Sequence, residues 1–115
     1  MKQFITILAL TLFSLNVSAQ APCKDGLCVV QYNANWNAGK SVDWLKKLTD
    51  CKVKEIDIAT DKEAAGKYKI VVVPTILIFN GSEEVGRFQA NIMMTMEATQ
   101  KDVQGKIDEI IMEDF

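Results

Sequence analysis

The sequence contains no histidine, so it lacks the side chain that most often acts as a neutral-pH acid or base and as a metal ligand. It has only two prolines in 115 residues, and its formal charge of −2 comes without a cluster of lysines or arginines. This balance excludes the basic footprint that nucleic-acid binding needs. With 49% hydrophobic and 24% charged residues, the composition fits one globular domain. We predict no cofactor, no metal and no nucleic-acid partner.

The amino-terminal stretch has the composition of an export signal. A positive start precedes an apolar run over residues 4–15, and a small-residue cleavage site ends at Ala19. The run is too short for a transmembrane helix. We therefore expect residues 1–19 to be a secretory signal peptide and residues 20–115 to form one domain. The protein is expected to be exported, either periplasmic or secreted, and not membrane-spanning once processed.

Three cysteines follow the predicted cleavage site: Cys23, Cys28 and Cys51. In an oxidising compartment two of them normally pair. Cys28 and Cys51 stand near the starts of two strands that we expect to be neighbours, whereas Cys23 and Cys28 are separated by a short turn. We favour a bridge that includes Cys28 and leave its partner open. Its expected role is to staple a small exported domain, ahead of a redox role.

The pattern of apolar residues predicts an α/β domain. The expected strands are Leu27–Asn33, Cys51–Ile58, Thr75–Phe79 and Glu84–Gln89. The expected helices are Gly39–Asp50, Asp61–Tyr68 and a last one from Thr99, with Val103, Ile107, Ile110 and Ile111 as its apolar stripe. The order predicts one mixed four-stranded sheet with helices on both faces, in which the first two strands run parallel.

Local signals support these elements. Asn37 is expected to cap the first helix and Thr99 the last, because their short polar side chains accept hydrogen bonds from exposed amides. The Asn80-Gly81 pair predicts a hairpin turn between the last two strands. The run from Val29 to Ser41 carries a strand directly into a helix, which is where α/β proteins usually place their chemistry.

The residues on this framework resemble the thioredoxin superfamily from about Leu27 to the carboxyl terminus. The matching pieces, in order, are V-V-Q-Y-N-A-N-W, K-Y-K-I-V-V-V-P-T-I-L-I-F, the Asn80-Gly81 turn and V-G-R-F. The resemblance implies a thioredoxin-like three-layer sandwich. The additional amino-terminal strand and helix of thioredoxin itself have no room in this chain.

The departures from the family concern its chemistry. The redox motif W-C-G-P-C corresponds to Trp36-Asn37-Ala38-Gly39-Lys40, which has no thiol. Thiol–disulfide exchange needs a thiolate, and an amide cannot supply one. The family's buried acid corresponds to Gln31, which cannot shuttle a proton. The resemblance therefore implies a redox-inactive domain that lacks the C-x-x-C motif, and we assign no catalytic residue.

The resemblance also implies that Pro74 is the family's cis-proline, which leaves the backbone of Val73 free to pair with a bound peptide. The alternative is a trans proline at an edge strand. The groove is expected to be lined by Trp36, Asn37, Val73, Pro74, Ala90 and Asn91. We expect it to hold a protein or peptide partner in the cell envelope. Trp36 packing over its own loop remains an equal alternative.

Three alternatives stay open. An atypical thiol–disulfide oxidoreductase or redox-homeostasis protein would use one of the three cysteines. Met93, Met94 and Met96 would bind cuprous ion through their thioethers, although core filling or an adaptable contact surface is the simpler prediction. Lys40 would hold an anion at a helix amino terminus, although a solvated lysine is favoured.

Overall fold

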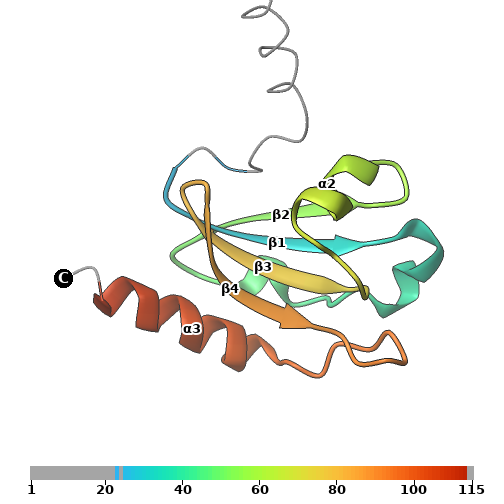
Figure 1. Ribbon diagram of the computed structural model, residues 1–115. Coiled ribbons are helices and arrows are strands. Elements are labelled where there is room, and N and C mark those ends of the chain that lie inside the picture. The colour runs from blue at the N-terminus through green and yellow to red at the C-terminus, as the bar shows by residue number, and fades with distance from the viewer. Residues whose placement is uncertain (1–22, 24, 114–115) are drawn as a thin grey trace, which may run out of the picture.

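The computed structural model describes residue 23 and residues 25–113 (Figure 1). The predicted signal peptide at residues 1–19 lies outside the described residues. The described strands are β1 (Leu27–Asn33), β2 (Lys52–Asp57), β3 (Thr75–Asn80) and β4 (Glu83–Gln89). The described helices are the 3₁₀ helices η2 (Asn35–Lys40) and η3 (Leu45–Lys47) and the α-helices α2 (Lys62–Lys67) and α3 (Gln100–Glu113). No helix among these has the length and apolar character needed to cross a membrane.

The four strands form one mixed sheet in the order β2-β1-β3-β4. β1 runs parallel to β2 and antiparallel to β3, and β3 and β4 form a hairpin. Every residue of β1 after Leu27 is buried, as expected for a central strand. The predicted sheet and its parallel pair are confirmed.

Side chains on the two faces of the sheet build two apolar cores, because successive residues of a strand point to opposite sides. On one face, Val29 and Ile78 pack with Val103 and Ile107 of α3. On the other face lie Val30, Tyr32, Leu77 and Phe79, covered by Ala64 of α2. Figure 1 shows α2 and α3 on opposite sides of the sheet. The three-layer α/β sandwich is confirmed.

Two helix caps follow from short polar side chains. The Asp61 carboxylate accepts a hydrogen bond from the Ala64 N–H at 3.2 Å and starts α2. At α3 the Asp102 N–H donates to Thr99 Oγ1 at 3.2 Å, and the Thr99 N–H donates back to Asp102 Oδ2 at 2.8 Å. The predicted cap at Thr99 is confirmed.

The predicted helix over Gly39–Asp50 is wrong. The segment forms only the two short 3₁₀ helices, separated by extended backbone at Ser41 (φ −64°, ψ 141°). The Val42 N–H, which a helix would bond to a preceding carbonyl, donates instead to Gln31 Oε1 at 2.9 Å. A buried side-chain acceptor thus diverts the chain from a helical path.

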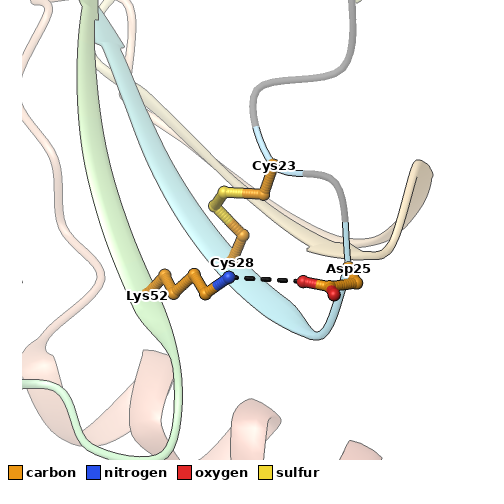
Figure 2. Close-up of a disulfide and its surroundings, with 4 residues drawn as sticks. All are labelled: Cys23, Asp25, Cys28 and Lys52. Atoms are coloured by element: carbon orange, nitrogen blue, oxygen red, sulfur yellow. Dashed lines mark hydrogen bonds and ion pairs between the residues drawn. A yellow bond between two sulfur atoms is a disulfide. The ribbon is translucent and has the colours of Figure 1, made fainter.

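The disulfide joins Cys23 to Cys28, at the start of β1 (Figure 2). A Cys28–Cys51 bridge is wrong because these residues belong to opposite faces of the sheet. Cys28 is aligned with Lys52 in the parallel ladder, so the neighbouring Cys51 points to the other side. Cys28 accordingly lies in the core under α2, whereas Cys51 packs against the core under α3 and is free.

Candidate functional site

Three connecting segments meet at the end of the sheet where β1 finishes and β3 begins. They are residues 34–42 after β1, residues 70–74 before β3, and residues 90–96 after β4. The Ala90 N–H donates to the Pro74 carbonyl at 3.0 Å, which joins the second and third segments. The Asn37 side chain joins the first to the second through the Val73 carbonyl. The structure thus brings the predicted groove residues into one region.

Asn37 acts as a polar clamp and not as a helix cap. It lies inside η2 with non-helical backbone angles, and Ala34 precedes that helix without a side-chain cap. Its Nδ2 donates to Asn33 Oδ1 at 3.1 Å and to the Val73 carbonyl at 3.4 Å. In return Asn33 Nδ2 donates to the Asn37 carbonyl at 3.0 Å and to Ser41 Oγ at 2.7 Å. The cap predicted at Asn37 is therefore wrong.

The Val73–Pro74 peptide bond is cis, and both side chains are buried. Thr75 Oγ1 donates to the Val72 carbonyl at 2.7 Å and fixes the backbone on the other side of this bond. The Val73 carbonyl accepts the 3.4 Å hydrogen bond from Asn37 Nδ2. No described residue accepts a hydrogen bond from the Val73 N–H. This backbone position therefore keeps a donor available and an acceptor that is weakly occupied.

The segment after β4 is a compact turn built on Asn91. Asn91 Oδ1 accepts hydrogen bonds from the N–H groups of Met93 (2.9 Å) and Thr95 (3.1 Å), and the Asn91 N–H donates to the Thr95 carbonyl at 3.0 Å. Met94 takes a positive φ of 61° within it. The turn therefore holds its side chains at defined positions.

Lys40 ends η2 and is exposed. Its Nζ donates to Thr95 Oγ1 at 3.0 Å, which ties the first segment to the turn on Asn91. Its expected place in the first turn of a long helix is wrong, because that helix does not form. Lys40 links two segments of the site.

Exposed apolar side chains gather on the same three segments. Among the described residues, five of the six exposed large hydrophobic side chains are Trp36, Val71, Ile92, Met93 and Met94. Trp36 is 65% exposed and Ile92 is 94% exposed. A gathered set of exposed apolar side chains is typical of an interaction surface. We call these five residues the apolar rim.

The predicted methionine cluster divides between surface and core. Met93 and Met94 belong to the apolar rim, whereas Met96 packs against the core under α3. Sequence reasoning did not select Val71, Ile92 or Asn33 for the site. The available signals were apolar side chains in connecting segments, Val71 within I-V-V-V-P and Ile92 beside two methionines, and an asparagine that ends a buried strand.

This chain resembles known proteins in its structure and not detectably in its sequence. No family model and no curated protein matches this chain. Among solved structures, it is similar to a mutant thioredoxin of Halobacterium salinarum, with a TM-score of 0.61 and 19% identity over 81% of this chain and 86% of that one. A Schistosoma mansoni thioredoxin gives a TM-score of 0.58 and 25% identity over 86% of each chain. The chain has the thioredoxin-superfamily fold.

A third likeness supports the same assignment. Thioredoxin-2, described as a component of the malaria parasite protein secretion machinery, gives a TM-score of 0.60 and 17% identity, over 76% of this chain and 85% of that one. The present chain therefore spans most of a thioredoxin. At identities this low, the structural likeness establishes the fold alone. The activity must be argued from the residues present.

In this thioredoxin fold the cysteines stand apart from the three segments. Cys23 and Cys28 are buried and paired at the start of β1. Cys51 precedes β2 and is half-buried; burial, followed by the Asp50 carboxylate, raises the pKa of its thiol. A raised pKa lowers the fraction of thiolate, which is the reactive form. Among the described residues, the groups that act on the Cys51 thiol therefore disfavour its reactive form.

Proposed function

We propose that this protein is an exported, redox-inactive thioredoxin-fold domain that binds an extended peptide or protein segment in the cell envelope. The groove would be formed by Trp36, Asn37, Val73, Pro74, Ala90 and Asn91. The observation that carries the proposal is that five exposed apolar side chains lie on the three segments that meet at Val73, whose N–H has no acceptor among the described residues.

Binding by strand addition fits this arrangement. An extended peptide gains affinity from main-chain hydrogen bonds and specificity from neighbouring side-chain contacts. The Val73 N–H would donate to the peptide, and the Val73 carbonyl would exchange the 3.4 Å contact with Asn37 for a peptide N–H. The apolar rim would cover alternate peptide side chains.

The absence of thiol chemistry at this position supports a binding role. Asn37 and Lys40 make structural hydrogen bonds, to Val73 and Thr95 respectively, and neither side chain is a nucleophile toward sulfur. The insulin-reduction assay tests this part of the proposal. We expect no reduction above the dithiothreitol background, and turnover at the rate of an ordinary thioredoxin would contradict it.

Affinity for extended peptides tests the binding part. A library of fluorescent peptides with alternating apolar residues would be titrated into the wild-type protein and into Trp36→Ala. We expect Trp36→Ala to weaken the best binder by about tenfold or more, because aromatic contacts dominate small interfaces. Trp44→Phe is the matched control, since Trp44 packs against the core under α3 and lies outside the rim. Equal affinity of all three proteins would rule out the groove.

The thiol oxidoreductase alternative makes a different prediction. It would require the buried Cys23–Cys28 disulfide or Cys51 to exchange with a substrate thiol. Trapping of mixed disulfides with a small dithiol, followed by mass mapping, measures this directly. We expect no adduct in the native protein.

A further inference from the structure

The four methionines in the described part of the chain have the same chemistry and different surroundings. Met93 and Met94 lie on the turn after β4, where they are 73% and 37% exposed. Met96, two residues further on, packs against the core under α3. Met112 lies near the end of α3, outside the apolar rim, and is 74% exposed. The rim therefore contains two thioethers, and the chain offers a buried and an exposed methionine for comparison.

Hydrogen bonds hold the backbone of Met93 and Met94 next to the peptide groove. The Met93 N–H donates to Asn91 Oδ1 and the Met94 N–H donates to the Asn91 carbonyl, both at 2.9 Å. Immediately before them, the Ala90 N–H donates to the Pro74 carbonyl at 3.0 Å and joins the turn to the cis-proline segment. The turn thus presents the two thioethers beside the groove from a defined backbone.

A thioether that is open to solvent can be oxidised by a hydroperoxide. The sulfur lone pair attacks one oxygen of hydrogen peroxide and an S–O bond forms as the O–O bond breaks. The departing hydroxide takes the proton from the new S–OH group and leaves as water. Sulfur is oxidised, the peroxide is reduced, and the product is methionine sulfoxide. This reaction converts a flexible apolar side chain into a polar one and disrupts Met-rich interfaces.

We propose that Met93 and Met94 form a modification site at which oxidation by a hydroperoxide switches off peptide binding. This regulation rests on the peptide binding proposed for the same groove. A peptide side chain that covers the thioethers displaces water from apolar groups, which is favourable. After oxidation the same contact buries a sulfoxide oxygen without a hydrogen-bond donor, which is unfavourable. Methionine sulfoxide reductases reverse the change, because two thiols reduce the sulfoxide and yield a disulfide and water.

The rest of the rim does not share this sensitivity. Ile92 and Val71 are 94% and 78% exposed, and their hydrocarbon side chains stay apolar in the presence of a hydroperoxide. Core filling, the simplest role of a methionine, is performed by Met96 and not by Met93 or Met94. Because the two reactive thioethers lie on the surface, their oxidation should weaken binding and leave the fold intact.

Mass mapping of the native protein after increasing times in hydrogen peroxide tests the site itself. We expect Met93 and Met94 to form sulfoxides about fivefold or more faster than Met96, because Met96 is packed against the core. The midpoint of urea unfolding should not change while Met96 is still reduced. Equal rates at Met93 and Met96 would show that the turn does not present its thioethers, and would overturn the site.

Peptide affinity before and after oxidation tests the switch. The best-binding extended peptide would be titrated into the wild type, the double variant Met93→Leu, Met94→Leu, and Met112→Leu. Oxidation should weaken binding about tenfold or more in the wild type and in Met112→Leu. The double variant should have the same affinity before and after treatment, because leucine is apolar and has no sulfur. Cys51 is present in all three proteins, so any effect of its oxidation would appear in each.

The outcomes separate this switch from the binding on which it rests. If the untreated wild type binds no peptide, both the proposed function and the switch are overturned. If the untreated wild type binds and its affinity is unchanged once Met93 and Met94 are sulfoxides, only the switch is overturned. An equal loss in all three proteins would also overturn it. Treatment with both epimer-specific methionine sulfoxide reductases should restore the affinity, and a loss that persists after complete reduction would show damage in place of a switch.

Discussion

At the scale of single residues, Asn37 defines the difference between this domain and a thiol-exchanging one. It occupies the position that the resemblance assigns to a nucleophile, and its amide is used within the protein. Asn37 Nδ2 donates hydrogen bonds to Asn33 Oδ1 at 3.1 Å and to the Val73 carbonyl at 3.4 Å. The residue therefore organises the loop and partly covers a backbone group that a peptide would use.

Substitution of Asn37 by alanine separates these two effects. We expect Asn37→Ala to lower the free energy of unfolding by about 1 kcal/mol, because the buried Asn33 side chain loses a partner. The same change should raise affinity for an extended peptide by about two- to tenfold, since the Val73 carbonyl no longer has to be vacated. Urea unfolding and peptide titration measure the two quantities. If Asn37→Ala lowered both the stability and the peptide affinity, Asn37 itself would be a residue that binds the peptide.

Cys51 gives a second prediction at this scale. Burial and Asp50 raise the pKa of its thiol, so the folded protein holds the proton to higher pH than an unfolded chain does. The rate of iodoacetamide alkylation should therefore rise with pH along a profile displaced above that of the same cysteine in urea. Rapid native alkylation near pH 7 would instead indicate an activated thiol and favour the oxidoreductase alternative.

At the scale of elements, α3 contains a glycine that lowers its stability and can be replaced. Gly105 lies inside the helix, and a Cβ placed there would meet nothing within 4 Å. Gly105→Ala should stabilise the protein by about 0.5–1 kcal/mol through reduced backbone entropy of the unfolded chain. Gly86→Ala in β4 is the contrast, because its Cβ would lie 3.1 Å from Ile78 Cδ1. Because Ile78 is fully buried and has little room to move, that variant should lose about 1 kcal/mol of unfolding free energy. Thermal unfolding compares the two, and stabilisation by both would contradict the packing described.

The elements that the sequence predicted are those fixed by local rules. Asp61 and Thr99 cap their helices, and Gly81 adopts a positive φ of 65° at the hairpin turn, because each of these interactions spans only a few residues. The near-continuous apolar run at the start of β1 predicted a central strand covered on both faces, and Val29 and Val30 lie in the two different cores. Periodicity and the crossover rule were sufficient for a mixed four-stranded sheet with a parallel first pair, but they did not predict the order β2-β1-β3-β4.

The helix predicted over Gly39–Asp50 does not form because of a contact between residues far apart in the sequence, which local rules do not include. The Val42 N–H bonds to Gln31, eleven residues earlier on a different element. The apolar spacing of Leu45 and Leu48 was correct for burial, and both side chains are in the core, but 3₁₀ and extended backbone place them there.

At the scale of the whole molecule, the disulfide is a staple at one end of the sheet and the candidate site lies at the other. The disulfide closes a short loop from Cys23 to Cys28, next to the exposed Lys52–Asp25 ion pair at 3.3 Å (Figure 2). An exposed pair of this kind contributes little to stability. Of these two interactions, the covalent bond is therefore the one expected to stabilise this end of the domain.

Removal of the bridge should change stability and leave binding intact. The double variant Cys23→Ala, Cys28→Ala is expected to lose about 2 kcal/mol of unfolding free energy, the amount that a loop this short gives in the chain-entropy model. Its affinity for peptides should match the wild type, because the apolar rim lies on other segments. Chemical denaturation and peptide titration provide the measurements. Loss of binding at unchanged stability would assign the disulfide a functional role.

The most direct test of the peptide-binding account is a ¹H–¹⁵N NMR titration of the wild-type protein with the best-binding extended peptide. The account predicts that the Val73 amide resonance shifts downfield as its N–H gains an acceptor, together with the indole resonance of Trp36, while the amides of Cys28 and Cys51 stay unchanged. A saturating titration in which the Val73 amide does not move would contradict the account.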